Sequence, residues 1–164
     1  MIIQNSMWVY IYTYLHLVCA DKIEIQGCTS SSQQAPENSC EMAFDTDINA
    51  DSTEWATNNE GVGAWIQLNF KQGYEIERLE IRHRSQPTAM RFKDIILEFS
   101  NGESHEYTLN DDSIILNQVV FVKLIVSDYL RITTISTYGT RDNGYSDIKV
   151  FGCILGNGSI KIYI

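Results

Sequence analysis

The sequence predicts an all-β protein, an antiparallel β-sandwich of about eight short strands. Apolar and polar residues alternate through most of the chain, which is the pattern of strands with one buried face. Polar turn residues separate these runs, and no run shows the 3.6-residue periodicity of an amphipathic helix. With 164 residues, the chain is long enough for one domain with a substantial core.

The first two alternating strands are expected at 64–70 and 76–84. In the first run apolar residues occupy every second position, and in the second Leu79, Ile81 and His83 share one face. Arginine and glutamate side chains fill the opposite face of the second run. Each strand should therefore bury one face and expose the other.

A β-hairpin is expected between a strand at 95–99 and its return strand at 105–109. Asn101 and Gly102 lie between them, and this pair favours a tight hairpin turn because both residues tolerate positive φ. Runs rich in β-branched and aromatic residues predict three more strands, at 119–126, 129–136 and 145–152.

The N-terminal segment 1–20 has the features of a cleaved secretory signal. The run 7–20 is uncharged and apolar, and it ends in Val-Cys-Ala before a polar residue. No basic residue precedes the run, and a core strand or helix is the alternative. The run is also short for a membrane span, which needs about 20 residues. We therefore predict a secreted, extracellular protein with its domain at 21–153 and a short tail at 154–164.

Removal of this signal leaves three cysteines, Cys28, Cys40 and Cys153. Disulfides persist in the oxidising environment that an exported protein meets. A bridge between Cys28 and Cys40 would close a short polar loop and contribute about 3 kcal/mol in the chain-entropy model. Cys153 would then be free or bonded outside the chain. Pairing of Cys153 with either other cysteine would instead tie the two ends of the domain together, and the local bridge is favoured.

The net charge of −9 limits the classes of partner. A uniformly acidic surface argues against nucleic acid and against general attraction to anionic membranes. Basic residues are concentrated at 78–93, where they form either a solvated face or a binding surface.

An oxygen-rich segment suits Ca²⁺, which takes about six to eight oxygen ligands. Its carboxylate, amide and hydroxyl side chains alternate along the chain at Asp45, Asp47, Asn49, Asp51 and Thr53. An EF-hand loop would need Gly and Glu where this chain has Ala50 and Ala56, so the segment is not an EF-hand. A solvated turn is the alternative, since Asp and Asn are ordinary turn residues.

Catalytic motifs are not found in the sequence. Only His83 and His105 follow the predicted signal, and neither belongs to a nucleophile motif. There is no phosphate-binding glycine loop and no His/Cys spacing typical of a metal site. We expect a protein that is not an enzyme.

Several sequence segments carry a family resemblance. They are Cys-Glu-Met-Ala-Phe-Asp followed by Thr-Glu-Trp, then Gly-Ala-Trp-Ile-Gln-Leu-Asn-Phe, then Arg-Leu-Glu-Ile-Arg-His-Arg, then Gly-Tyr-Ser-Asp-Ile-Lys-Val-Phe-Gly-Cys. Their order and spacing resemble the discoidin, or coagulation factor V/VIII type C, superfamily and the related galactose-binding-like carbohydrate modules. The resemblance covers Cys28 to Cys153 and implies a jelly-roll sandwich.

The resemblance also implies one structural Ca²⁺ between the loop before Thr-Glu-Trp and the start of the last strand. The residues that would supply its oxygen ligands are Met42, Asp45, Asp47, Thr53, Ser146 and Asp147. Many relatives have Glu at the position of Asp147, whose side chain is one methylene shorter. Such an ion would cross-link the two ends of the domain.

Family members bind ligands at loops on one end of the sandwich, which correspond here to 57–63, 82–92 and 137–145. Arginine forks suit carboxylates, sulfates and hydroxyl pairs, and aromatic faces stack on sugars. The expected ligand contacts from these loops are His83, Arg84, Arg91, Tyr138, Arg141 and Asn143. For His83, a buried and satisfied side chain is the alternative.

Together these features predict a secreted, Ca²⁺-stabilised module that binds carbohydrate or a glycoconjugate. The alternative is an extracellular adhesion domain that binds a protein receptor. A third hypothesis is binding to anionic phospholipid, as in relatives with exposed apolar spikes, for which Met90 and Phe92 are the candidates. The acidic composition argues against membrane lipid as the partner.

Overall fold

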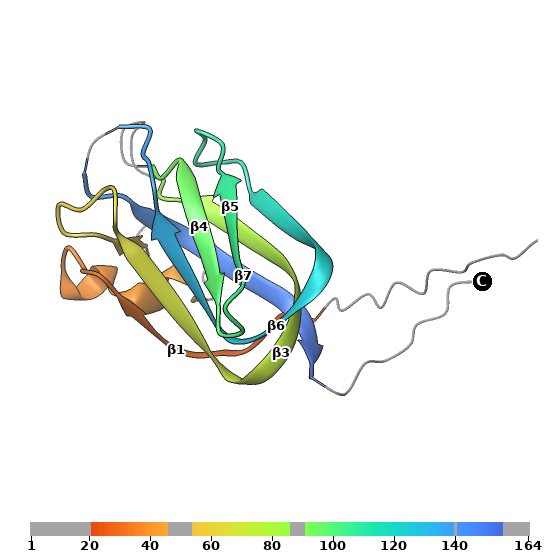
Figure 1. Cartoon of the computed structure of the whole chain (residues 1–164). Helices are drawn as coiled ribbons and strands as arrows, with labels where there is room; N and C mark the ends of the chain where they lie inside the picture. The colour runs from red at the N-terminus through yellow and green to blue at the C-terminus, as the bar shows by residue number, and fades with distance from the viewer. Residues whose placement is uncertain (1–20, 46–53, 86–90, 140, 156–164) are drawn as a thin grey trace, which may run out of the picture.

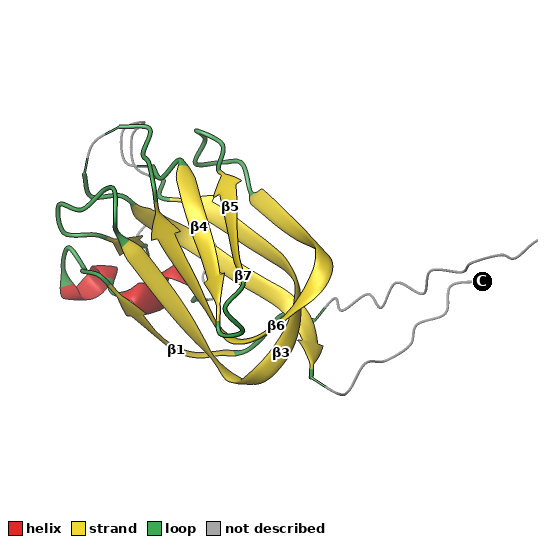
Figure 2. Ribbon diagram, in the orientation of Figure 1, coloured by secondary structure: helices red, strands yellow, loops and turns green. Residues whose placement is uncertain are grey.

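The computed structural model of the chain describes residues 21–45, 54–85, 91–139 and 141–155 (Figure 1). Strands dominate these ranges, and two short 3₁₀ turns are the helical elements among them (Figure 2). In chain order the elements are β1 (Ile25–Ser30), η1 (Pro36–Asn38), η2 (Cys40–Ala43), β2 (Trp55–Ala56), β3 (Trp65–His83), β4 (Asp94–Phe99), β5 (Ser104–Thr108), β6 (Asn117–Thr134) and β7 (Gly144–Ile154). No helix within the described ranges is long and apolar enough to cross a membrane.

The strands form one antiparallel sheet that folds over into the two layers of a sandwich (Figure 1). Its order is β2-β7-β3-β6-β4-β5, with β1 beside β3. The first half of β3 pairs with β1 and the second half with β7, while β6 runs beside both halves. The long strands therefore pass from one layer to the other, and the predicted all-β sandwich is confirmed.

The long strands merge elements that the sequence predicted separately. The predicted strands 64–70 and 76–84 are both parts of β3, and 119–126 and 129–136 are both parts of β6. The pairing register shifts between Asn69 and Tyr74, where the two halves of β3 meet. The residues between the halves remain part of the strand, and the backbone bends there but does not reverse its direction. The seven predicted segments thus form five strands, and with β1 and β2 the described ranges hold seven strands, where about eight were expected.

The core lies between the layers and is filled by the faces that the alternation predicted. Among its fully buried residues are Ile66, Leu68, Leu79, Ile81, Ile95 and Leu97. Beside the loops that precede β3 and β7, the rings of Trp55, Phe92 and Tyr145 form a cluster with centroids 4.9 to 6.1 Å apart. The proposed membrane spike is thus wrong for Phe92, which is buried, and Met90 lies outside the described residues.

The hairpin between β4 and β5 is confirmed. Gly102 has φ +85°, a conformation that glycine adopts without the steric cost of a side chain, and its N–H donates to the Phe99 carbonyl at 3.0 Å. This end of the molecule is a tight polar turn.

The predicted disulfide between Cys28 and Cys40 is present and joins β1 to η2. Cys153 on β7 is disulfide-bonded as well, and no cysteine within the described ranges is free. Of the two states expected for Cys153 beside the local bridge, the free thiol is therefore wrong.

Candidate ligand-binding site

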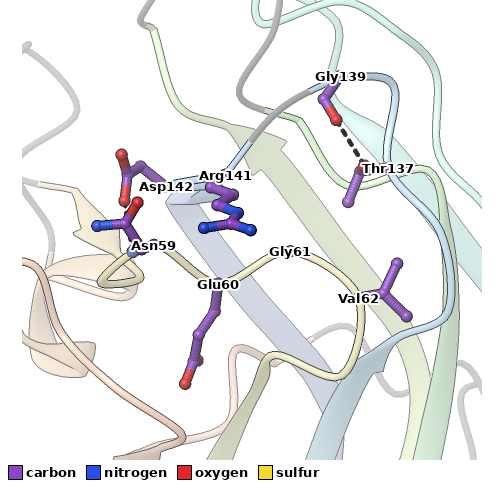
Figure 3. Close-up of a pocket in the computed structure, with 8 residues that line it drawn as sticks. All are labelled: Asn59, Glu60, Gly61, Val62, Thr137, Gly139, Arg141 and Asp142. Atoms are coloured by element: carbon purple, nitrogen blue, oxygen red, sulfur yellow. Dashed lines mark hydrogen bonds between the residues drawn. The ribbon is translucent and has the colours of Figure 1, made fainter.

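A pocket of about 890 Å³ opens between two loops of the sandwich (Figure 3). The first loop joins β2 to β3 and the second joins β6 to β7, and both were predicted as ligand loops. The lining residues are Asn59, Glu60, Gly61, Val62, Thr137, Gly139, Arg141 and Asp142. We call the four charged or amide-bearing members, Asn59, Glu60, Arg141 and Asp142, the rim.

Two residues of the rim hold the loops in a tight conformation. Asn59 has φ +57° and Asp142 has φ +64°, in the left-handed region that Asn and Asp enter more readily than most residues. The Asn59 N–H donates to Asp142 Oδ1 at 2.6 Å, and the Thr57 N–H donates to the Asn143 carbonyl at 2.9 Å. The two loops are thereby bonded to each other.

The charged side chains of the rim point in different directions (Figure 3). Arg141 is exposed and extends toward the opposite loop. Glu60 accepts a hydrogen bond from Ser31 Oγ at 2.5 Å, and its carboxylate points away from Arg141. The Asp142 carboxylate accepts the N–H of Asn59. Arg141 is the charged rim residue that makes no hydrogen bond or ion pair within the described part of the chain.

Beneath the rim, Arg84 and Glu54 form a buried ion pair. Arg84 Nε donates to Glu54 Oε2 at 2.6 Å, and both side chains are more than nine-tenths buried. Glu54 Oε1 also accepts from the hydroxyl of Ser85 at 2.6 Å. Arg84 Nη1 donates to the Asp142 carbonyl at 2.6 Å. This network therefore fixes the second pocket loop to the end of β3 and the start of β2.

His83 and Tyr145 are packed in the interior next to this network. The Nε2 of neutral His83 donates to the Asn110 carbonyl at 3.0 Å, and the two rings stack with centroids 6.3 Å apart. Loss of hydration on burial lowers the pKa of His83 to about 4 and raises the pKa of the Tyr145 hydroxyl. Both side chains are therefore uncharged at neutral pH. We refer to Glu54, His83, Arg84 and Tyr145 as the buried layer.

Comparison with protein family models assigns this chain to a family. A family model described as "Domain of unknown function (DUF7402)" matches residues 19–151. The chain belongs to this family. A search of the curated proteins found no match to this chain.

Solved structures share the fold of this DUF7402 domain at low sequence identity. The family 32 carbohydrate-binding module of NanJ from C. perfringens, solved with galactose, superposes with a TM-score of 0.66 at 17% identity, over 76% of this chain and 92% of that chain. The fucose-binding module SpX-3 of Streptococcus pneumoniae has a TM-score of 0.64 at 18% identity, over 82% and 99% of the two chains.

Discoidin II of Dictyostelium discoideum has a TM-score of 0.62 at 10% identity, over 79% of this chain and 56% of that chain. The predicted likeness in fold to the discoidin-type, galactose-binding-like modules is confirmed.

Of the six predicted ligand contacts, Arg141 lines the pocket. His83 and Arg84 belong to the buried layer, in agreement with the alternative expectation for His83. Arg91 is also buried, and its Nη1 donates to Asp111 Oδ1 at 2.8 Å. The three described residues His83, Arg84 and Arg91 thus point inward, toward internal partners.

The two remaining predicted contacts flank the second pocket loop. The Tyr138 hydroxyl donates to the Leu109 carbonyl at 2.6 Å, and Asn143 is fully buried. Their role as ligand contacts stays a prediction, as it does for His83, Arg84 and Arg91. In the DUF7402 domain the polar groups of these side chains bond to other parts of the chain and support the loops.

Three rim residues, Asn59, Glu60 and Asp142, were not singled out from the sequence although their loops were. The available signal was the turn composition of Asn-Asn-Glu-Gly and Arg-Asp-Asn-Gly. Such sequences favour left-handed residues, and two of the three adopt that conformation. The turn chemistry was visible, but the bond between the two turns was not.

The predicted calcium ligands are described only in part, because Asp47 and Thr53 lie outside the described residues. Met42 lies in η2, Asp45 follows shortly after it, and η2 packs against β7. Ser146 Oγ donates to the His83 carbonyl at 2.6 Å. The elements that carry the two halves of the predicted site are therefore neighbours.

The Asp147 carboxylate provides the test of whether these residues fit a cation. Asp147 is 6% exposed, and Lys149 bonds to its Oδ2. Its buried Oδ1 has no hydrogen-bond partner among the described residues, so this oxygen is available to a further cation. Within the described ranges, three metal-ligating side chains converge at Cys28, Cys40 and Glu41, where the disulfide removes the thiolates. The Asp147 oxygen fits a calcium ligand.

Proposed function

We propose that this DUF7402 domain is a non-catalytic module that binds carbohydrate at the rim. The observation that carries the proposal is an exposed guanidinium, that of Arg141, extending across a pocket whose loops are fixed from below. The fold supports it, because solved modules with the same fold include one bound to galactose and one described as fucose-binding. Preorganised loops reduce the ordering cost of binding a small polar ligand.

A glycan array at millimolar Ca²⁺ tests the proposal, with the Arg141→Ala and Arg131→Ala proteins beside the wild type. Arg131 is a matched control because it is a partly exposed arginine on β6, outside the pocket lining. We expect binding to a subset of glycans, loss with Arg141→Ala and retention with Arg131→Ala. Absence of binding to any glycan, together with tight binding to a protein from extracellular extracts, would establish an adhesion domain instead.

We also propose that Ca²⁺ stabilises the fold between the segment after η2 and the start of β7. Met42, Asp45, Asp47, Thr53, Ser146 and Asp147 are the residues that would hold it, and the unpartnered Asp147 Oδ1 supports the proposal. The ion would supply charge compensation and a cross-link between distant parts of the chain.

Secretion is the third part of the proposal, and the Cys28–Cys40 disulfide supports an oxidising compartment. Cleavage after residue 20 would leave three cysteines, an odd number, whereas cleavage before Cys19 would leave four. Intact mass and free-thiol titration of protein recovered from the medium distinguish the two. We expect a shortened N-terminus. Full-length protein retained in the cytosol with reduced thiols would contradict secretion.

A further inference from the structure

We infer that the pocket selects saccharides that carry a carboxylate, and that Arg141 is the group that binds it. The inference rests on the proposed function and names the ligand class of the same site. The rim offers one exposed cation, and its position between the two loops is fixed by the buried layer.

The composition of the pocket argues against a neutral sugar held by stacking. No aromatic ring is found among the described residues that line it, and Val62 is the one large apolar side chain there. Aromatic faces supply much of the contact energy when a protein binds the apolar side of a sugar ring. Without such a face, binding must depend on polar groups, of which Arg141 has the most donors.

The state of the other rim charges supports the same conclusion. The Glu60 carboxylate bonds to Ser31, and the Asp142 carboxylate bonds to the Asn59 N–H, so both acids already have protein donors. Both point away from the space into which Arg141 extends (Figure 3). The group presented to a ligand is therefore the guanidinium.

The buried arginines show what a guanidinium on this scaffold does when a carboxylate is present. Arg84 binds Glu54 at 2.6 Å and Arg91 binds Asp111 at 2.8 Å. Arg141 makes no comparable bond within the described residues. A planar guanidinium matches a carboxylate in a two-point contact that neutral hydroxyls do not reproduce with equal strength. A ligand carboxylate would complete this pattern at the rim.

Titration calorimetry with three matched probes tests the inference: galacturonic acid, its methyl ester and methyl galactoside. The ester keeps the ring and removes the negative charge. The variants are Arg141→Ala, Arg141→Lys and the control Arg131→Ala. We expect galacturonic acid to bind about ten-fold more tightly than either neutral probe, a difference of about 1.4 kcal/mol. Arg141→Ala should abolish this preference, Arg141→Lys should retain part of it, and Arg131→Ala should leave it unchanged.

Equal affinity for the three probes would overturn the inference and leave the proposed carbohydrate binding intact. The same holds if the acid is preferred but Arg141→Ala does not change the preference. Failure of every glycan on the array to bind would instead overturn the proposed function, and the inference with it. The two failures are therefore distinguishable.

Discussion

The rim and the buried layer lie next to each other and contain the same kinds of residue, yet their bonding differs. In the buried layer, Glu54 and Arg84 neutralise each other, and His83 is held uncharged. At the rim, Arg141 is exposed without an ion pair in the described part of the chain. The comparison teaches that a polar residue near a pocket is available to a ligand to the extent that the protein has not already satisfied it.

The largest expected effect comes from breaking the buried layer at Arg84. Arg84→Met should destabilise the domain by about 3–5 kcal/mol, because it leaves the Glu54 charge buried without its cation. Chemical denaturation measures the change. The double variant Glu54→Gln with Arg84→Met removes the orphaned charge. Its loss of unfolding free energy should therefore be smaller than the sum of the losses in the two single variants.

A loss below 1 kcal/mol for Arg84→Met would show that the ion pair does not hold the loops. Additive single and double variants would show the same. In either case, Arg84 would not support the distinction between a buried layer that holds the loops and a rim that binds the ligand.

The second effect is a pH dependence that we expect from His83 in the buried layer. The pKa of His83 falls to about 4 in the folded protein, mainly because burial disfavours its charged form, with Arg91 adding to the decrease and Asp111 and Asp112 opposing it. The unfolded chain therefore binds a proton before the folded one does. Stability should be full above pH 6.5 and fall by about 3 kcal/mol as pH decreases toward 4.

Denaturation at pH 7 and at pH 4.5 measures this slope. His83→Gln, which keeps a donor for the Asn110 carbonyl, should reduce the difference in unfolding free energy between the two pH values. His105→Gln is the control, since His105 is exposed on β5 and should leave the difference unchanged. An unchanged difference in His83→Gln would mean that the slope comes from carboxylates elsewhere.

The third effect concerns the proposed calcium. Free Ca²⁺ at one hundred times its dissociation constant should add about 2.7 kcal/mol if it binds only the folded state. Calorimetric melting with Ca²⁺ and with chelator measures the gain. Asp147→Asn should abolish it and Asp128→Asn, at an exposed acid on β6, should not. Identical melting of the wild type in both conditions would argue against the metal.

The strand pattern was predictable because burial on one face leaves a period of two in the sequence. Ile66, Leu68, Leu79 and Ile81 were assigned to the core on that basis and are buried. The continuity of β3 was not predictable. The segment between its halves has the polar composition of a turn, whereas in the folded chain both halves pair with β6.

The pocket loops were predictable from turn composition and family resemblance. Which of their residues support the loops and which face the pocket was not predictable. Arg84 lies at the end of one predicted strand and Arg141 lies shortly before another, so the two arginines look alike in sequence. Arg84 is buried because Glu54, thirty residues earlier, meets it in the folded chain. A contact over that separation leaves no local pattern. The same reason explains why the bond between Asn59 and Asp142 was missed.

The smallest expected effect on stability is the one that most sharply separates the two regions. Arg141→Ala should change the free energy of unfolding by less than about 0.5 kcal/mol, because the side chain is exposed and makes no described bond that would be lost. Chemical denaturation beside Arg84→Met checks this value. A substantial loss in Arg141→Ala would mean that the guanidinium already supports the fold, and its value as a binding group would fall accordingly. Near-neutral stability combined with lost glycan binding would place Arg141 at the rim in function as well as in position.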